Sequence, residues 1–373
     1  MAHLELLRPL LAIGLLIALV APCRLVADDR FERIDPEAAG WSPEGLAELE
    51  TFLDDSGSSA LLLIDDGKVV FEWGDIHRRH TVHSIRKALL SSLVGIAVDR
   101  GSLKLDTTLD ASGIDDIEPK PTAAELRATV GDVLKSRSGV YHPAAAEAPG
   151  MIAARPARGS HGPGEHYYYN NWDFNVAGAL VEEALGKDLY TAFLDEVARP
   201  LGMLHYRGRF TTRDGTDDAI PETDGFYQFE PEKSRFPAYH FRMSAHDLAL
   251  YGMLYLRRGV WNGRRILSEE WIDASTTSYS VTNPRIGIGY GMLWKVLLET
   301  ERRSAGSFFH TGVGVHMLGV YPTSKLVFVH RVATEREYEF PERNLYRIIG
   351  LVFAARQPSS KPTVAEAERG TNP

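Results

Sequence analysis

The sequence predicts an α+β protein: one lobe built on an antiparallel sheet flanked by helices, and a second, all-helical lobe. Apolar patterns of period two, typical of strands, occur near both ends of the chain, whereas residues 102–285 show mostly helical periodicity. The simplest arrangement joins the early and late strands in one sheet. The sheet lobe is therefore expected to combine residues 28–101 with 286–356, and the helical lobe to comprise 102–285. A site in the crevice between the lobes would follow.

The first part of the chain contains clear start and turn signals. Ser42 followed by Pro43 is typical of a helix start, because serine caps the first turn and proline fits its first position. Residues 60–64 and 69–73, joined by Asp-Asp-Gly, predict a β-hairpin. Residues 84–99 predict a second helix, with a glycine just beyond its end.

The remaining elements follow in order. Helical periodicity in the middle is clearest over residues 123–134, 172–185 and 245–256. The period then drops to two, which predicts strands over residues 289–298, 307–321 and 326–332, before a final helix over about 344–356. The polar, proline-containing segment 357–373 is predicted to be a disordered tail.

Residues 1–27 have the order of a secretory signal. Arg8 precedes an apolar run over 10–21, and Leu-Val-Ala ending at Ala27 offers a cleavage point. The run of about a dozen residues is short for a stable membrane span, so we expect a cleaved signal, with an uncleaved anchor as the alternative. Either form predicts that the body of the protein is exported. The cleaved form predicts a periplasmic or secreted protein with no stable membrane span after signal removal.

The only cysteine, Cys23, lies within this signal segment. A lipid anchor there is disfavoured because Pro22 stands where a small residue is expected. The mature chain would then contain no thiol, which excludes disulfides, cysteine catalysis and cysteine-bound metals.

The composition indicates an ordinary globular protein, with 44% hydrophobic and 24% charged residues. A net charge of −9 and the lack of a basic run give no support for nucleic-acid binding. No dinucleotide or phosphate-loop fingerprint predicts a cofactor, and the Gly-x-Ser-x-Gly elbow of α/β-hydrolases is absent.

The first chemical motif is Ser84-Ile85-Arg86-Lys87 at the start of the predicted helix. Residues three apart share a helical face, so Lys87 can reach the Ser84 hydroxyl. Serine needs a base to become a nucleophile, and a lysine with a lowered pKa can serve. By itself the motif is weak, since a capping serine with a solvent-facing lysine explains it equally well.

The second motif is the run from Pro163 to Asn171, which contains three consecutive tyrosines. A phenol near a lysine can act as a general base, and an asparagine two residues later can orient the lysine or a substrate amide. Tyr168 with Asn170 and Tyr169 with Asn171 both fit this spacing. We favour the second pair because Asn171 would also cap the following helix. At least one of the tyrosines is expected simply to pack under a loop.

The third motif is His310-Thr311-Gly312 within an apolar strand. Glycine allows a substrate to approach a strand edge, and the residue two positions earlier faces the same side. A buried histidine without catalytic function is the alternative for His310 alone.

Together, in this order, the three motifs resemble Ser-x-x-Lys, Tyr-x-Asn and Lys/His-x-Gly of the serine β-lactamase and penicillin-binding-protein superfamily. Within it the chain is most similar to class C β-lactamases, esterases and D-aminopeptidases. The segments 134–139 and 243–271 also resemble the family's Leu-x-x-x-x-Ser-Gly loop and its late helical region. The resemblance spans roughly residues 42–355 and implies the β-lactamase/transpeptidase-like fold.

The resemblance implies an acyl-enzyme mechanism without cofactor or metal. Ser84 would attack a carbonyl while Lys87 and Tyr169 manage its proton, and either of these two remains a candidate for the base. The backbone N–H groups of Ser84 and Val313 would bind the oxyanion, and Asn171 would orient Lys87 and the substrate.

The substrate expectation rests on one departure from the family. Many β-lactamases have lysine at the position of His310, and a histidine is mostly neutral near pH 7. The sequence therefore favours small esters, amides or peptides over penicillins. A β-lactamase or D,D-carboxypeptidase, and a non-catalytic penicillin-binding-like domain, are the alternatives.

The histidines before the nucleophile suggest a rival metal site formed by His77, His80 and His83. Their spacing does not repeat on one helical face, so we interpret them as surface or rim residues. His83 and Arg86 flank Ser84 and are hypothesised to line the cleft.

Overall fold

The computed structural model describes residues 31–356 except 216, 218 and 302. Contacts within the chain divide it into two units, residues 1–30 and residues 31–373. The predicted signal segment with Cys23 and the predicted tail lie outside the described residues and stay predictions. The proposed division into two lobes also stays a prediction.

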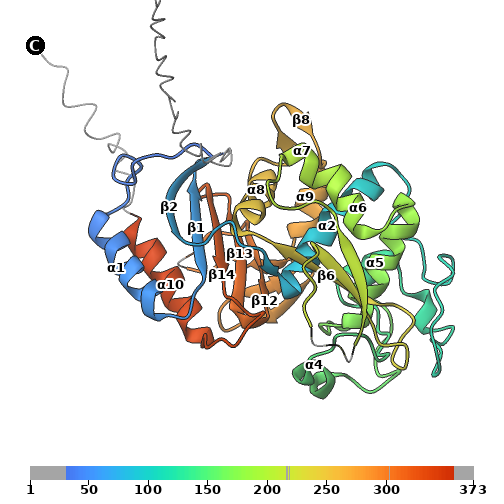
Figure 1. Cartoon of the computed structure of the whole chain (residues 1–373). Coiled ribbons are helices and arrows are strands. Elements are labelled where there is room, and N and C mark those ends of the chain that lie inside the picture. The colour runs from blue at the N-terminus through green and yellow to red at the C-terminus, as the bar shows by residue number, and fades with distance from the viewer. Residues whose placement is uncertain (1–30, 216, 218, 302, 357–373) are drawn as a thin grey trace, which may run out of the picture. The chain divides into compact units, whose positions relative to one another are not determined.

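An eight-stranded antiparallel sheet joins the two ends of the described chain (Figure 1). The first strand, β1, pairs directly with the last, β14, so the expected union of early and late strands is confirmed. In sheet order the strands are β2 (Lys68–Gly74), β1 (Ala60–Asp65), β14 (Leu326–Arg331), β13 (His316–Tyr321), β12 (Ser307–Gly312), β11 (Lys295–Leu297), β10 (Ile288–Tyr290) and β9 (Ser280–Asn283).

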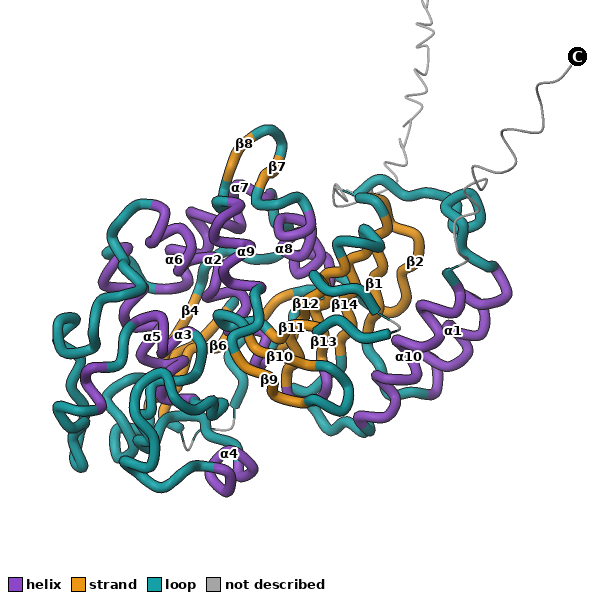
Figure 2. Tube along the Cα trace, turned by 180° about the vertical axis from the view of Figure 1, so that it is seen from behind, coloured by secondary structure: helices purple, strands orange, loops and turns teal. Residues whose placement is uncertain are grey.

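Helices cover both faces of this sheet, which explains why β1 is buried at every position. Leu61 and Leu63 pack with α1 (Pro43–Asp55) and α10 (Glu342–Ala355), which lie side by side in Figures 1 and 2. Leu62 and Ile64, which point to the other face, belong to the core that includes α2 (Arg86–Asp99) and α8 (Ala245–Leu256). The predicted cap is confirmed, since Ser42 Oγ accepts from Gly45 N at 3.1 Å.

The fold class is confirmed, but the expectation that residues 102–285 are all-helical is wrong. Three strands from this segment join β3 (His80–Thr81) in a second sheet. They are β4 (Phe210–Asp214), β5 (Gly225–Phe229) and β6 (Ala238–Met243). Burial gives the physical reason: β5 and β6 are buried along most of their length, so they lack the period-two alternation of half-exposed strands.

Helices and loops make up most of the rest of this segment (Figure 2). The helices include α3 (Val130–Leu134), α4 (Pro149–Ala154), α5 (Asn171–Leu185), α6 (Leu189–Phe193), α7 (Arg199–Leu201) and α9 (Glu269–Thr276). Short helical turns are η1 (His83–Ile85), η2 (Glu125–Arg127), η3 (Leu194–Ala198) and η4 (Val313–Val315), and β7 (Val260–Trp261) pairs with β8 (Arg264–Arg265). No helix in the described part of the chain is long and apolar enough to cross a membrane.

Two predicted elements are interrupted for local reasons. The helix expected over 123–134 divides into η2 and α3, because Thr129 and Asp132 form a reciprocal capping box that starts a new helix. The strand expected over 289–298 divides into β10 and β11, with Leu293 between them at φ 67°. A left-handed residue ends the extended run there.

Asp247, in the first turn of α8, fixes the chain that leads toward β4. Its buried carboxylate accepts hydrogen bonds from the backbone N–H groups of Leu204, His205 and Tyr206 at 2.8, 2.9 and 2.9 Å. Burial alone would raise the pKa of Asp247, but hydrogen bonds from His205 and His246 lower it below its usual range.

We expect Asp247→Ala to lower the free energy of unfolding by about 3 kcal/mol, because it leaves buried N–H groups without an acceptor. Urea denaturation followed by circular dichroism measures this loss. Asp99→Ala is the control, since Asp99 is exposed although it accepts from Ser268 N and Oγ at 3.0 and 2.6 Å. Equal losses in the two variants would contradict the assigned role of Asp247.

Candidate active site

Ser84 lies in η1, in the short connection between β3 and α2. The residue before it, His83, has φ 49°, a left-handed conformation that is costly for a residue with a side chain. Ile85 is fully buried and its N–H donates to Val82 O at 3.1 Å. The turn that presents Ser84 is thus strained on one side and anchored in the core on the other.

Lys87 is brought to Ser84 as the motif predicted. Its Nζ donates to Ser84 Oγ at 3.0 Å, although the lysine side chain is only 2% exposed. The ammonium lies 4.8 Å from the ring centre of Tyr169 and 4.6 Å from that of Phe174. Burial, followed by the charges of Arg86 and Lys295, lowers the pKa of Lys87 well below its usual value. The neutral amine, which can accept a proton, is therefore favoured.

Of the two tyrosine registers, the structure places Tyr169 at this site. Burial raises the pKa of Tyr169 to about 12, and a hydrogen bond with Ser84 opposes that shift. Tyr168 points elsewhere, since its hydroxyl donates to Met151 O at 2.8 Å. Tyr167 packs against Tyr290 with ring centres 5.2 Å apart. A neutral phenol at Tyr169 can donate a hydrogen bond toward Ser84.

The expectations for Asn171 need correction. The cap of α5 is Asn170, whose Oδ1 accepts from Trp172 N at 3.1 Å, because the chain is still extended at Asn170 and helical from Asn171 onward. Asn171 Nδ2 donates to Ala146 O at 2.5 Å and Ala145 O at 3.4 Å. Its buried Oδ1 has no partner among the described residues, so the expected contact with Lys87 is not made.

The end of β12 lies against the turn that holds Ser84. A Cβ added to Gly312 would sit 2.4 Å from Val82 O and 3.0 Å from His83 Cβ, so only glycine permits this approach. Val313, the next residue, is 56% exposed.

His310 is fully buried two residues earlier. Its Nδ1 lies 2.9 Å from Thr311 O, which can only accept, so the proton is on Nδ1 and the unpartnered Nε2 carries a lone pair. Burial, then Lys295 and Lys87, lowers the pKa of His310 well below its usual value. His310 is thus a neutral residue beside a group of basic side chains, Arg86, Lys87 and Lys295, which we call the cationic cluster.

Lys295 on β11 is a member of this cluster that the sequence analysis did not identify. Its Nζ donates to Thr311 Oγ1 at 2.8 Å, and burial lowers its pKa. The signal was present as a single lysine between the apolar residues Trp294 and Val296. Its relation to His310 depends on the pairing of β11 with β12, which sequence alone does not give.

His83 is held by a second unforeseen group, Thr334. The His83 Nε2 and His316 Nε2 atoms lie 2.8 and 3.2 Å from Thr334 Oγ1, and the two rings stack with centres 5.4 Å apart. His316 Nδ1 accepts from Arg331 Nε and Val332 N at 3.1 and 3.2 Å, so His316 carries its proton on Nε2 and donates to Thr334.

Arg86, by contrast, does not line a cleft. It is 2% exposed, its guanidinium lies 4.3 Å from the ring centre of Tyr239, and it donates to Asn175 Oδ1 at 3.3 Å. The hypothesis that Arg86 lines the cleft is therefore wrong, because its side chain packs in the interior against Tyr239 and Asn175. Its positive charge still acts on Lys87 from there.

The histidines do not form the rival metal site. The ring of His77 lies 5.1 Å from that of His205, whereas His83 stacks on His316. Among the described residues, His205, His246 and Asp247 have ligand atoms within 4.8 Å of one another. The Asp247 carboxylate already accepts three backbone hydrogen bonds, so we interpret this cluster as one that stabilises the chain at residues 204–206.

The family model for Beta-lactamase matches residues 47–352. The chain belongs to this family. No curated protein matches the sequence. The chain therefore has the fold of a family of β-lactamase-like serine hydrolases.

Solved structures agree with this fold. A protein from Bacillus anthracis proposed to be a 6-aminohexanoate-dimer hydrolase matches with a TM-score of 0.62 and 18% identity, over 88% of this chain and 87% of that one. An octameric penicillin-binding protein homologue from Pyrococcus abyssi matches with a TM-score of 0.60 and 19% identity, over 87% of this chain and 80% of that one. EstCE1, a hydrolase with promiscuous acyltransferase activity, matches with a TM-score of 0.57 and 16% identity, over 83% of this chain and 98% of that one.

In this β-lactamase-family chain, we expect Gly312→Ala to reduce kcat/KM on a small ester about 100-fold. The added methyl collides with Val82 O and displaces the turn that carries Ser84, and a shift of about 1 Å near a nucleophile costs on the order of 100-fold. Gly350→Ala is the control, because nothing lies within 4 Å of its Cβ position. Full activity of Gly312→Ala would show that this close approach is dispensable.

Proposed function

We propose that this protein is an exported serine hydrolase that cleaves ester or amide bonds of small substrates through an acyl-enzyme on Ser84. The observation that carries the proposal is the 3.0 Å contact between Ser84 Oγ and the buried Nζ of Lys87, with Tyr169 on the same hydroxyl. Export is supported by the order of charged and apolar residues in segment 1–27.

In the acylation step, the neutral amine of Lys87 accepts the Ser84 proton as Oγ bonds to the substrate carbonyl carbon. The pKa shifts favour this assignment, because burial lowers the pKa of Lys87 and raises that of Tyr169. As the bond to the leaving group breaks, the leaving oxygen or nitrogen takes a proton from the Tyr169 phenol. Lys87 then returns its proton to Tyr169.

In the deacylation step, water adds to the acyl carbon and its proton passes through Tyr169 to Lys87. Ser84 Oγ leaves and recovers a proton from the same pair. The backbone N–H groups of Ser84 and Val313 are the proposed oxyanion donors, each of which typically contributes ~3 kcal/mol.

Small esters and amides are the favoured substrates because His310 is neutral where many family members have lysine. The names of two relatives, a proposed 6-aminohexanoate-dimer hydrolase and a hydrolase with acyltransferase activity, are compatible with this class. A β-lactamase or D,D-carboxypeptidase is the second candidate. It is favoured by Lys295, which brings a buried cation to Thr311 from the neighbouring strand.

The nucleophile is tested with residues 28–373 and 4-nitrophenyl butyrate in the pre-steady state. We expect a product burst near one equivalent in the wild type and none in Ser84→Ala. Fluorophosphonate labelling of both proteins is the second readout. Labelling that persists in Ser84→Ala would reject the assignment, and neither burst nor labelling in the wild type would favour the non-catalytic domain.

The base is tested through the pH dependence of kcat/KM. Lys295→Met removes a positive charge that lowers the pKa of Lys87, so that pKa should rise. The amine then loses its proton only at higher pH, and the acid limb of the profile should move upward by about one pH unit. Two variants serve as controls. Lys295→Arg keeps the positive charge. Lys325→Met removes the charge of an exposed lysine that pairs with Asp66 at 3.0 Å and takes no part in the site. Neither control should shift the limb. An unshifted limb in Lys295→Met would exclude Lys87 as the group observed.

A further inference from the structure

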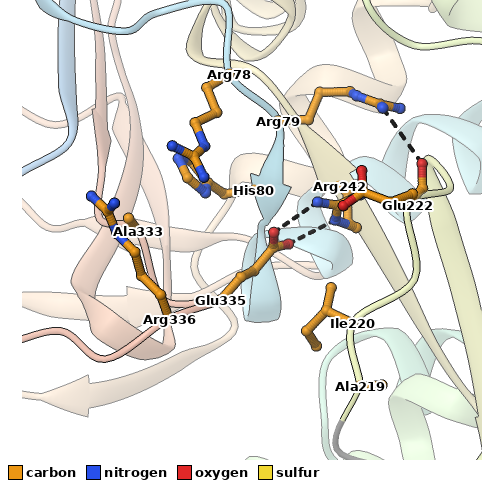
Figure 3. A pocket seen from close by; sticks show the side chains of 10 residues that line it. All are labelled: Arg78, Arg79, His80, Ala219, Ile220, Glu222, Arg242, Ala333, Glu335 and Arg336. Atoms are coloured by element: carbon orange, nitrogen blue, oxygen red, sulfur yellow. Dashed lines mark hydrogen bonds and ion pairs between the residues drawn. The ribbon is translucent and has the colours of Figure 1, made fainter.

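A pocket of about 540 Å³ is lined in part by residues 78–80, which precede the turn with Ser84 in the chain (Figure 3). Its wall is built from three segments that are distant in sequence. Arg78, Arg79 and His80 come from the entry into β3, Arg242 comes from β6, and Glu335 and Arg336 follow β14. The short 219–222 segment between β4 and β5 completes it.

The pocket has an excess of positive charge after its internal ion pairs are counted. Arg242 forms two hydrogen bonds of 2.7 Å with Glu335, drawn as dashed lines in Figure 3, and Arg79 pairs with the buried carboxylate of Asp224. Arg78 and Arg336 are exposed, and their side chains make no ion pair with any residue that the structure describes. Two guanidinium groups are therefore available to a ligand.

Two acidic residues line the pocket, and neither forms an ion pair with these two arginines in the described part of the chain. Glu222, whose side chain is 93% exposed, has its carboxylate 3.9 Å from Arg242 Nη1. Glu335 accepts from Thr81 N and Thr81 Oγ1 at 2.7 Å each, in addition to its bonds with Arg242. Burial alone would raise the pKa of Glu335, but the bonds from Arg242 and Thr81 lower it to about 2. Its carboxylate is thus fully occupied by protein donors.

His80 independently indicates a ligand site, because one of its ring nitrogens is buried at the pocket without a hydrogen-bond partner in the described part of the chain. The His80 side chain is 2% exposed, and the nitrogen without a partner is Nδ1. Burial, then Arg331, lowers the pKa of His80 to about 4, with further contributions from Arg78 and Arg242. The imidazole is neutral at pH 7 and stands in a positive local potential, although the whole chain has a net charge of −9.

Two connections relate the pocket to the nucleophile. Ser84 is four positions after His80 in the chain, which limits the separation of their Cα atoms to about 14 Å. Thr334 lies between two lining residues, Ala333 and Glu335, and holds His83 at 2.8 Å. The pocket is therefore within reach of a linear substrate whose carbonyl is at Ser84.

We propose that this pocket binds the carboxylate of the substrate, so that the enzyme acts on esters or amides whose acyl chain ends in a free carboxylate. The inference rests on the proposed function for its scissile bond. Paired N–H donors of an arginine match the two oxygens of a carboxylate, and Arg78 and Arg336 supply them from two segments that are distant in sequence. The length of the acyl chain would determine which substrates reach both sites.

The kinetic test compares two esters of equal chain length, the 4-nitrophenyl monoester of adipic acid and 4-nitrophenyl hexanoate. The wild type should show a KM about tenfold lower for the adipate monoester. In the double variant Arg78→Gln/Arg336→Gln this preference should disappear through KM, while kcat/KM for hexanoate stays unchanged. Arg343→Gln, an exposed arginine on α10 outside the pocket, should keep the preference.

A binding test separates this inference from the proposed function. Isothermal titration of monomethyl adipate into Ser84→Ala requires no turnover and should show binding that Arg78→Gln/Arg336→Gln removes. Binding without hydrolysis of either ester would retain the pocket and reject the hydrolase. Ester hydrolysis with equal KM values and no binding would retain the hydrolase and overturn the pocket. Inorganic phosphate that binds in place of the adipate monoester would also overturn the substrate-carboxylate assignment.

Discussion

The burial of Lys87 is the constraint on which the rest of the site depends. The residues of α2 from Arg86 to Ala97 are buried, because this helix runs through the core rather than along the surface. Lys87 cannot turn to solvent from that position, and its neighbours Arg86 and Lys295 are both positive. An ammonium surrounded in this way is costly, and release of its proton relieves the cost. A neutral amine is thus favoured at a residue that is normally protonated.

The surroundings of the two neighbouring basic residues, Arg86 and Lys87, differ. Arg86 keeps its charge and lies over the ring of Tyr239 with a hydrogen bond to Asn175. Lys87 has two aromatic rings and the Ser84 hydroxyl, and no carboxylate pairs with it in the described part of the chain. A carboxylate at that position would hold the lysine protonated. The contrast between the two neighbours explains how one helical turn can contain both a permanent cation and a base.

The strained turn before Ser84 needs support, and a buried arginine provides it. Arg331 donates to the carbonyls of His80, Thr81 and Met243, and also to His316, which reaches His83 through Thr334. These contacts fix β3, which enters the turn, and the end of β6, which pairs with β3. A residue at positive φ persists only where its surroundings determine its conformation, as they do for His83.

Local sequence predicted the parts of the site that lie within one element. The spacing of Ser84 and Lys87 follows from a single helix, and Gly312 from a strand end. The preference for Tyr169 agrees with the geometry although its reason was wrong, because one residue decides whether Asn170 or Asn171 caps α5. Lys295 and Thr334 could not be assigned, since their contacts depend on strand pairing and on chain segments more than 200 residues from Ser84. Strands β5 and β6 were missed because burial on both faces removes the alternation that identifies a strand.

The arrangement of positive charge limits where an anionic substrate group can be held. Two unit charges 4 Å apart interact by about 4 kcal/mol at an effective dielectric constant of 20, and by about 2 kcal/mol at 10 Å. A carboxylate bound directly at Lys295 would therefore raise the pKa of Lys87 and return the proton that the cationic cluster removes. Neither Lys87 nor Lys295 lines the arginine pocket, and the pocket opens to solvent, which screens its charge further. An anion held there can orient a substrate and still leave Lys87 neutral.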